Sequence, residues 1–185
     1  LDNWYANYTD LNKTGTKITD QIYCNDRTAS ISRSGTAGEI NSWASTGKTY
    51  YYGTYLRLYG DSSNPSPSLK CTNANDKFTT TIAKGNGKLS YPVGLITADE
   101  VNMAGADNQQ SSNSSYYLYN GSVYWAGSPR GFYGSYSGVF GLLMVYGLNF
   151  GDVGARSIGA RGVVSLSSES KLLGSGTYND VYTVN

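Results

Sequence analysis

The sequence predicts an α+β fold in which short helices pack on a mixed or antiparallel sheet with long loops. Two segments have helical character, one at the start of the chain and one near residue 100, and many short extended runs separated by turn residues fill the second half. Strands and helices do not alternate regularly, which disfavours a parallel βαβ sheet. The 185 residues are expected to form one domain, residues 1–185.

The first half begins with a short predicted helix, because Leu1, Trp4, Tyr5 and Tyr8 follow the i, i+3, i+4, i+7 spacing of one helix face. The start at Leu1 rather than Met suggests a mature or excised part of a longer chain. The other elements expected here are a short strand and polar loop at 21–35, a strand or a helical turn followed by a strand at 48–60, a Pro-rich connector at 61–71, and extended runs at 78–82 and 89–96 joined by a tight turn at 84–88.

A second helix is predicted to begin after Thr97. Thr97 and Glu100 form a T-x-x-E capping box, in which each side chain satisfies a backbone N–H of the first turn. Ile96 and Val101 occupy the two positions of a hydrophobic staple. Asp99 lies in the first turn, where a negative charge interacts favourably with the helix dipole. These two residues, Thr97 and Glu100, are therefore assigned a structural capping role.

The adjacent carboxylates of Asp99 and Glu100 could instead suggest acid–base chemistry. Sequence neighbours on a helix project about 100° apart, so the two groups do not converge on one substrate atom. Gly105 follows the last helical residue, where a left-handed C-terminal cap is expected. Capping explains the segment without chemistry.

The rest of the second half is expected to be mainly extended. The expected elements are a long polar loop at 105–115, a hairpin at 116–129 that turns at 120–122, a strand within 138–154, a buried strand at 160–172 and a hairpin-like tail at 174–185.

Composition excludes several classes of function. The net charge is +1, and the 14 basic residues are scattered, which disfavours nucleic acid and membrane surfaces as partners. No apolar run is long enough for direct membrane insertion of this segment. The chain has no His, which removes Ser-His-Asp triads, Cys-His dyads and His-ligated zinc. Its two cysteines, Cys24 and Cys71, form either one disulfide or two buried thiols.

The residue palette favours a secreted binding protein. The chain holds 18 Tyr and 23 Gly with abundant Ser, Thr and Asn. Tyr, Ser, Gly and Asn build binding surfaces such as antibody loops, although Tyr also simply suits β-strands. Asn/Asp-rich loops could offer oxygen ligands to Ca²⁺, but none has EF-hand spacing, so we expect no metal and no cofactor.

Several segments together resemble a group of extracellular domains from Gram-positive gut bacteria and their phages, some of them on pilin-like or surface proteins. The similar segments are LDNWYANY, YCNDRT, LKCTN with DKFT, YPVGLITADEV with MAG, YLYNG with YWAGSP, GARGVVSLSS and GSGTYNDVYTV. The resemblance implies a C-type-lectin-like fold, related to the formylglycine-generating enzymes. It also implies that Cys24 and Cys71 form a disulfide and that Arg161 is a structural residue near a core strand.

Catalysis by that enzyme superfamily is not expected here. The formylglycine-generating enzymes use two late cysteines, and this chain has none after Cys71. The calcium-binding triplets of animal C-type lectins are absent as well. No catalytic residue is therefore predicted, and the chain is expected not to be an enzyme.

The predicted ligand-binding surface is the aromatic stretch between residues 108 and 136. Tyr, Trp and Arg dominate interface hot spots, and an exposed cluster of them marks an interaction site. Trp125 is expected in the core. The residues predicted to bind ligand are Tyr116, Tyr117, Tyr119, Tyr124, Arg130, Phe132, Tyr133 and Tyr136.

The sequence thus predicts an extracellular, cell-surface or phage-tail domain that recognises a protein or glycan ligand through Tyr/Ser/Gly-rich loops, as an adhesin or receptor-recognition module. One alternative is a structural subunit of a pilus or surface layer, assembled from many copies. Another is a variable protein diversified by a retroelement. A divergent formylglycine-generating-type enzyme is the least favoured alternative.

Overall fold

The structure, a computed structural model, has the predicted α+β composition, with many strands and a few short helices. It describes residues 1–7, 17–30, 49–60, 64–83, 85, 87–106, 113, 115–116, 118–133, 137–143, 147–152, 154 and 158–184. The helical elements are α1 (Asp2–Asn7), α3 (Gly53–Tyr55), the π-helix η2 (Leu56–Gly60), the 3-10 helix η3 (Ala74–Asp76) and α4 (Ala98–Met103). The strands are β1 (Ile18–Thr19), β2 (Tyr23–Cys24), β3 (Ala29–Ser30), β4 (Thr49–Tyr52), β5 (Lys77–Thr79), β6 (Gly87–Lys88), β7 (Gly94–Leu95), β8 (Tyr124–Tyr133), β9 (Ser137–Leu143), β10 (Gly147–Asp152), β11 (Gly159–Ala160), β12 (Gly162–Val163), β13 (Ser165–Leu166), β14 (Leu172–Leu173) and β15 (Thr183–Val184).

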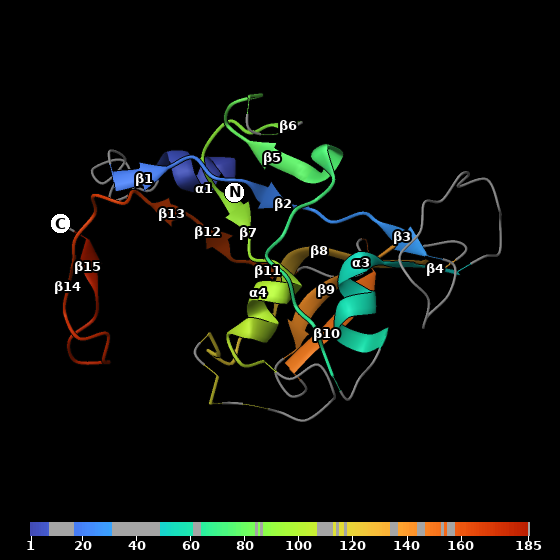
Figure 1. The fold of residues 1–185 in the computed structure, drawn as a ribbon. Helices are drawn as coiled ribbons and strands as arrows, with labels where there is room; N and C mark the ends of the chain where they lie inside the picture. The colour runs from blue at the N-terminus through green and yellow to red at the C-terminus, as the bar shows by residue number, and fades with distance from the viewer. Residues whose placement is uncertain are drawn as a thin grey trace.

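A six-stranded sheet forms the centre of the molecule (Figure 1). Its strand order is β10-β9-β8-β4-β3, and β11 pairs with β8 as well. The β11–β8 pair is parallel, whereas the other neighbours are antiparallel. The sheet is therefore mixed, which is one of the two arrangements that the sequence predicted.

The longest strand, β8, corrects the predicted hairpin at 116–129. Residues 120–122 lie in a loop before β8, with Gly121 at a φ of 72°, and the strand begins only at Tyr124. Its antiparallel partner is β9, which follows β8 in the chain. The pairing register shifts on either side of Pro129, a residue that cannot donate to the ladder and is tolerated at such irregularities.

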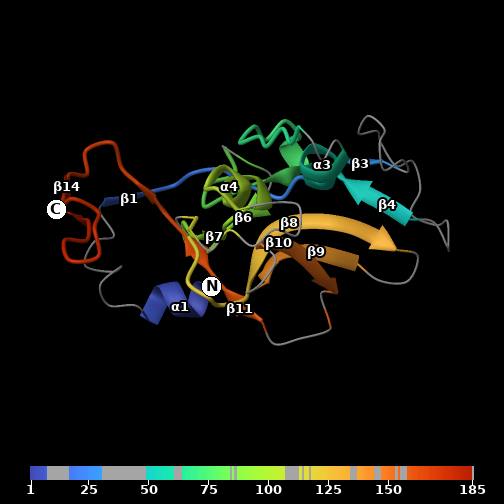
Figure 2. The same ribbon diagram turned by 90° about the horizontal axis from the view of Figure 1, so that it is seen from below.

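The helices α4 and α3 lie side by side on one face of this sheet, as Figures 1 and 2 show. Both contact β8. The core lies between them and the sheet, and its fully buried members include Tyr55, Leu58, Val101 and Phe140. Three tyrosines of β4, α3 and η2 form a row of stacked rings that ends on Phe140. Segment 48–60 thus contains a strand followed by helical turns. The sequence predicted either a strand alone or a helical turn followed by a strand, so both kinds of element are present but in the opposite order to the second alternative.

The predicted signals at both ends of α4 are confirmed. The side chain of Thr97 accepts from the backbone N–H of Glu100, and the side chain of Glu100 accepts from the backbone N–H of Thr97. At the other end, Gly105 has a φ of 102°, and its N–H donates to the carbonyl of Asn102. The N–H of Ala106 donates to the carbonyl of Val101 at 3.2 Å. These two bonds form a Schellman motif.

Smaller sheets surround the central one and correct two further expectations. The last two residues of the tight turn predicted at 84–88 form the strand β6 instead, which pairs in parallel with β5. The single buried strand predicted at 160–172 is instead three short strands, β12, β13 and β14, with partly or fully exposed residues. The hairpin-like tail is confirmed by the antiparallel pair β14–β15. In both ribbon views this hairpin lies at the opposite end of the molecule from β3 and β4 (Figures 1 and 2).

Candidate functional site

A cleft of about 190 Å³ lies where the loop after β7 leads into α4. Six parts of the chain line it: segment 21–26, the α3–η2 helical segment, residues 68–70, the β7–α4 joint, β8 and β12. The cleft therefore gathers residues that are far apart in the sequence. Titratable side chains from four of these parts line it.

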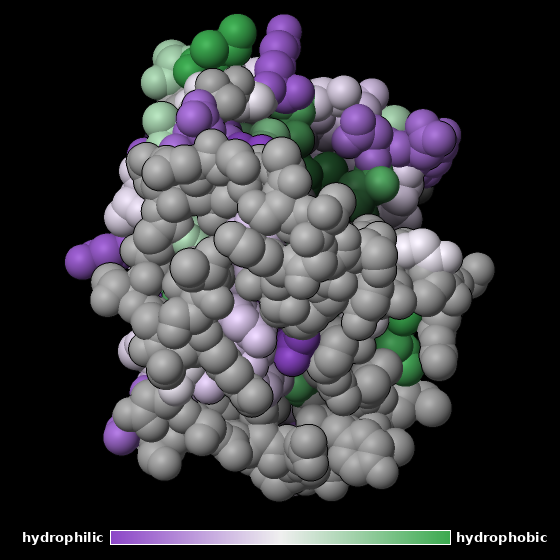
Figure 3. Space-filling model, turned by 90° about the vertical axis from the view of Figure 1, so that its right-hand side faces the viewer, coloured by the Kyte–Doolittle hydropathy of each residue, from purple (hydrophilic) through white to green (hydrophobic). Residues whose placement is uncertain are grey.

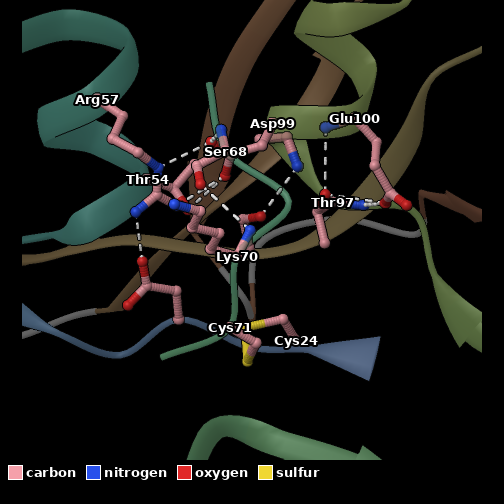
Figure 4. Close-up of polar contacts among 12 residues, drawn as sticks. Cys24, Thr54, Arg57, Ser68, Lys70, Cys71, Thr97, Asp99 and Glu100 are labelled. Atoms are coloured by element: carbon pink, nitrogen blue, oxygen red, sulfur yellow. Dashed lines mark hydrogen bonds and ion pairs between the residues drawn. A yellow bond between two sulfur atoms is a disulfide. The ribbon is translucent and has the colours of Figure 1, made fainter. Parts of the chain in front are cut away.

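A three-membered ion-pair network connects the helical elements beside the cleft. The Nη2 and Nε of Arg57 donate to the two carboxylate oxygens of Asp99, each at 2.8 Å. The Nη1 of the same guanidinium donates to Asp26 at 2.6 Å. This network and its neighbours are drawn in Figure 4. One arginine on η2 thus binds a carboxylate from α4 and another from the loop after β2.

Asp99 is the buried centre of the network, with a residue exposure of 3%. It also accepts hydrogen bonds from the hydroxyl of Thr54 at 3.1 Å and from the backbone N–H of Ser68 at 2.9 Å. The capping box fixes the first turn of α4, which directs the Asp99 side chain toward Arg57. The sequence predicted only a favourable interaction of Asp99 with the helix dipole. In the structure, its carboxylate also accepts four hydrogen bonds.

The predicted disulfide is confirmed and lies at the edge of the cleft. Cys24 of β2 and Cys71 of the connector before η3 are bonded, with Cα atoms 5.7 Å apart. The connector is also tied to η2 by the N–H of Ser66, which donates to the carbonyl of Arg57. The Ser68–Asp99 bond holds this connector against α4, and the disulfide holds its end against β2. The cleft wall is therefore a cross-linked segment rather than a loop held by one contact.

The charges around the cleft nearly balance. Burial would lower the pKa of Arg57, but the hydrogen bonds and charges of Asp99 and Asp26 outweigh this effect and raise the pKa above its usual value. Arg57 therefore remains a cation. Among the lining residues, Asp26, Asp99 and Glu100 oppose Arg57 and Lys70, so two cations and three carboxylates leave a net charge of −1.

The carboxylates at the start of α4 are engaged in hydrogen bonds within the protein. The chain has no His, and both cysteines are in the disulfide. Asp99 is engaged by four donors, and one oxygen of Glu100 accepts from both the N–H and the hydroxyl of Thr97. In the part of the chain that the structure describes, no group of three or more His, Cys, Asp or Glu side chains could hold a metal ion.

The aromatic residues predicted to bind ligand do not form one exposed surface. Tyr116 and Tyr124 lie in the core, at 5% and 3% exposure, with their hydroxyl groups 3.3 Å apart. Burial is the main reason that the pKa of Tyr116 is raised. Because neither ring reaches the surface, the structure argues against ligand contacts at these two positions. The partly buried Tyr119 packs on the same cluster.

The other predicted residues lie on or beside β8. The guanidinium of Arg130 lies 4.7 Å from the centre of the Tyr55 ring, and Phe132 is partly exposed. Tyr133 ends β8, but its side chain is outside the described part of the structure, as are the whole residues Tyr117 and Tyr136.

The sheet register brings a second aromatic segment to Phe132 and Tyr133. In the β4–β8 pair, Thr49 lies opposite Tyr133 and Tyr50 opposite Phe132, with the rings of the latter pair 6.5 Å apart. We call Tyr50–Tyr52 together with Phe132–Tyr133 the aromatic sheet end. The side of the molecule on which β3 and β4 lie faces the viewer in Figure 3. Tyr50–Tyr52 are not among the residues predicted to bind ligand, although three consecutive tyrosines are a signal visible in the sequence.

Arg161 occupies a structural position, as the resemblance implied. Its guanidinium lies 4.2 Å from the centre of the Tyr124 ring, and its Nη1 donates to the carbonyl of Leu118. It therefore joins the loop before β8 to the segment between β11 and β12.

Comparisons with known proteins add no relative. No family model matches the chain, and neither the curated proteins nor the solved structures include a match. Within the described residues, no helix is long and apolar enough to cross a membrane.

Proposed function

We propose that this chain is a non-catalytic, extracellular binding domain of C-type-lectin-like architecture, displayed on a cell surface or a phage tail. In this role it recognises a protein or glycan on a cell surface, as an adhesin or receptor-recognition module. The observation that carries the proposal is the aromatic sheet end, where two aromatic segments from distant parts of the chain lie in register.

Aromatic side chains on adjacent strands suit ligand recognition. They offer a large contact area with little loss of side-chain entropy, and the tyrosines among them also carry hydroxyl groups that donate and accept hydrogen bonds. Tyr51, Tyr52 and Phe132 are each partly exposed, while Tyr50, which lies opposite Phe132, is buried at 2%. A sheet supplies a stiffer base for such groups than a loop does.

An extracellular location agrees with the disulfide. Structural disulfides persist in oxidising compartments and are rare in the cytosol. Cys24 and Cys71 are bonded in a domain that carries no other cysteine.

Binding to an array of mammalian and bacterial glycans and to immobilised mucin tests the proposal. We expect Tyr52→Ala and Phe132→Ala to reduce binding about tenfold or more, as the loss of an aromatic hot spot does. The matched control is Tyr178→Ala, since Tyr178 is 96% exposed on the hairpin at the other end of the molecule. The control should bind like the parent protein, and unchanged binding by both sheet-end variants would place the ligand elsewhere.

A structural role in a pilus or surface layer is the second candidate, and the C-terminal hairpin favours it. Its large apolar and aromatic side chains are unusually exposed, and these are Leu172, Leu173, Tyr178, Val181 and Tyr182. An exposed apolar patch of this kind marks an interaction site. If copies assemble through it, light scattering should detect oligomers that Leu172→Ser/Leu173→Ser dissociates, whereas a monomer at all concentrations would exclude this role for the hairpin.

A further inference from the structure

We infer that the cleft beside α4 binds a small neutral polyol, the size of one sugar ring, without a metal ion. This site is distinct from the aromatic sheet end, so the inference goes beyond the proposed function. It follows from the size of the cleft, its charge, its hydrogen-bonding groups and its rigidity.

The size of the cleft sets the size of the ligand. A volume of about 190 Å³ corresponds to roughly six water molecules at about 30 Å³ each. Sites for drug-sized ligands are larger, at about 300–1,000 Å³. The cleft therefore suits a single ring or a fragment of that size, such as the terminal residue of a glycan.

The charge of the cleft disfavours ionic ligands of either sign. With three carboxylates and two cations, its net charge of −1 repels phosphates and carboxylates. A cation would need the carboxylates of Asp26 and Asp99, but the guanidinium of Arg57 already lies between them. Arg57 thus occupies the place that a metal ion would take, and a neutral ligand is the remaining class.

The hydrogen-bonding groups left at the cleft both donate and accept. Arg57 directs its Nε, both hydrogens of Nη2 and one hydrogen of Nη1 to protein oxygens, which leaves the second Nη1 hydrogen without an acceptor among the described residues. The side chains of Arg57 and Asp26 are 23% and 17% exposed, whereas that of Asp99 is only 4% exposed. The open side of the network is therefore the Arg57–Asp26 pair.

A third group lies deeper in the cleft. Ser128 is 2% exposed, and its hydroxyl oxygen accepts from the backbone N–H of Ala98 at 2.9 Å. Its hydroxyl hydrogen has no acceptor among the described residues. A ligand that fits all three groups must accept from Arg57 and Ser128 and donate to Asp26. Each hydroxyl of a polyol does both.

Apolar side chains complete the cleft. Ile22, Leu69, Leu95 and Val163 are among its lining residues. A sugar ring presents C–H groups between its hydroxyls, so it can contact both the apolar and the polar side chains of the cleft. A purely polar solute would instead place its polar groups against the apolar side chains. This combination distinguishes a ring-shaped polyol from urea-like or inorganic solutes.

The cleft is held in place before any ligand binds. The disulfide fixes one wall, the capping box fixes the start of α4, and Asp99 joins both to Arg57. A site whose side chains are already oriented loses little conformational entropy on binding. Even a ligand with few contacts can therefore bind measurably.

A backbone-amide NMR titration of the full chain tests the inference, with methyl glycosides of common hexoses and N-acetylhexosamines as probes at millimolar concentration. We expect at least one probe to shift amides of 21–26, 68–70 and 97–100, equally with and without EDTA. Inorganic phosphate and acetate serve as the anionic probes and CaCl₂ as the cationic probe, and none should bind there.

Two variants and one matched control make the test specific. Asp26→Asn keeps the size of the side chain but removes its charge, and should weaken binding about tenfold, as the loss of a charged hydrogen bond does. Gln21→Ala alters the rim without touching the Arg57 network, so it keeps the test valid if Asp26→Asn fails to fold. Asp2→Asn, outside the cleft, should bind like the parent protein.

The outcomes separate this inference from the proposed function. Shifts confined to the cleft and weakened by Asp26→Asn or Gln21→Ala support it, whatever happens at the aromatic sheet end. It is overturned if no methyl glycoside shifts the cleft amides, if shifts occur only at 50–52 and 131–133, if EDTA abolishes them, or if only phosphate or acetate produces them.

Discussion

Replacing Asp99 by Ala should destabilise the protein far more than replacing its neighbour Glu100. Asp99 is buried and accepts four hydrogen bonds, two of them from the guanidinium of Arg57. Removing one member of a buried ion pair leaves the other charge uncompensated and costs about 3–5 kcal/mol. Glu100→Ala removes one half of a capping box, a loss of about 1 kcal/mol. A dipole interaction alone would give Asp99 only about 0.3–1 kcal/mol.

Urea unfolding at pH 7 with the disulfide intact, followed by intrinsic fluorescence, measures both free energies. A double-mutant cycle with Arg57→Met then isolates the pair. We expect a coupling of about 2–3 kcal/mol, because the double variant leaves neither Asp99 nor Arg57 as a charge without its partner. Asp26 loses Arg57 in both the single and the double variant, so that cost cancels in the cycle. Thr54 and Ser68 still lose an acceptor, so the double variant stays below the parent protein in stability. A cost for Asp99→Ala no larger than that for Glu100→Ala, or additive effects in the cycle, would show that Asp99 and Arg57 do not form a stabilising pair.

Three further predictions concern other contacts. The Cys24→Ala/Cys71→Ala variant should lose about 4 kcal/mol of unfolding free energy, because the disulfide joins residues 47 positions apart. Mass spectrometry of the parent protein should find neither cysteine alkylated before reduction. Alkylation without reductant would contradict the presence of the disulfide. Burial raises the pKa of Tyr23 from 10.0 to about 12, so the neutral phenol stabilises the fold fully below pH 10 and progressively less as the pH rises through 12. Tyr23→Phe should therefore flatten the alkaline stability profile in urea titrations, and an unchanged slope would count against it. Gly94→Ala should clearly lower the melting temperature, because a Cβ at this position would lie 2.2 Å from the Tyr23 ring. Gly154→Ala is the control and should leave the melting temperature unchanged, because the space around Gly154 is open. Equal melting temperatures for the two variants would exclude the steric explanation.

Features encoded within a few residues could be predicted from the sequence. The start of α4 depends on Thr97 and Glu100, three positions apart, and its end depends on Gly105, so one short segment contains all the necessary information. The hairpin at 116–129 was wrong for the opposite reason. Its turn residues form a local bend around Gly121, but strand pairing is decided by which distant strand packs best, and β8 pairs with β9 and β4 instead.

The candidate site depended on contacts that local patterns do not report. Arg57 and Thr54 reach Asp99 across 42 and 45 residues, so no spacing rule connects them. The aromatic stretch raised a second difficulty, because Tyr in a Ser/Gly-rich segment is equally compatible with a buried and an exposed position. Tyr116 and Tyr124 are in the core, whereas Phe132 is partly exposed, although all three lie in the same Tyr/Ser/Gly-rich stretch of sequence.

The acidic pair at the start of α4 divides two tasks between neighbouring residues. The side chain of Glu100 turns back and accepts from the backbone N–H of Thr97, a contact within the first turn of the helix. Asp99, one position earlier, turns away toward Arg57 and joins α4 to η2 and to the cross-linked connector. The helix itself needs only the first interaction, whereas the shape of the cleft needs the second. Asp99→Ala should therefore leave the capping box and the helical amide pattern of 98–103 intact while the amides of 66–70 lose their protection from hydrogen exchange.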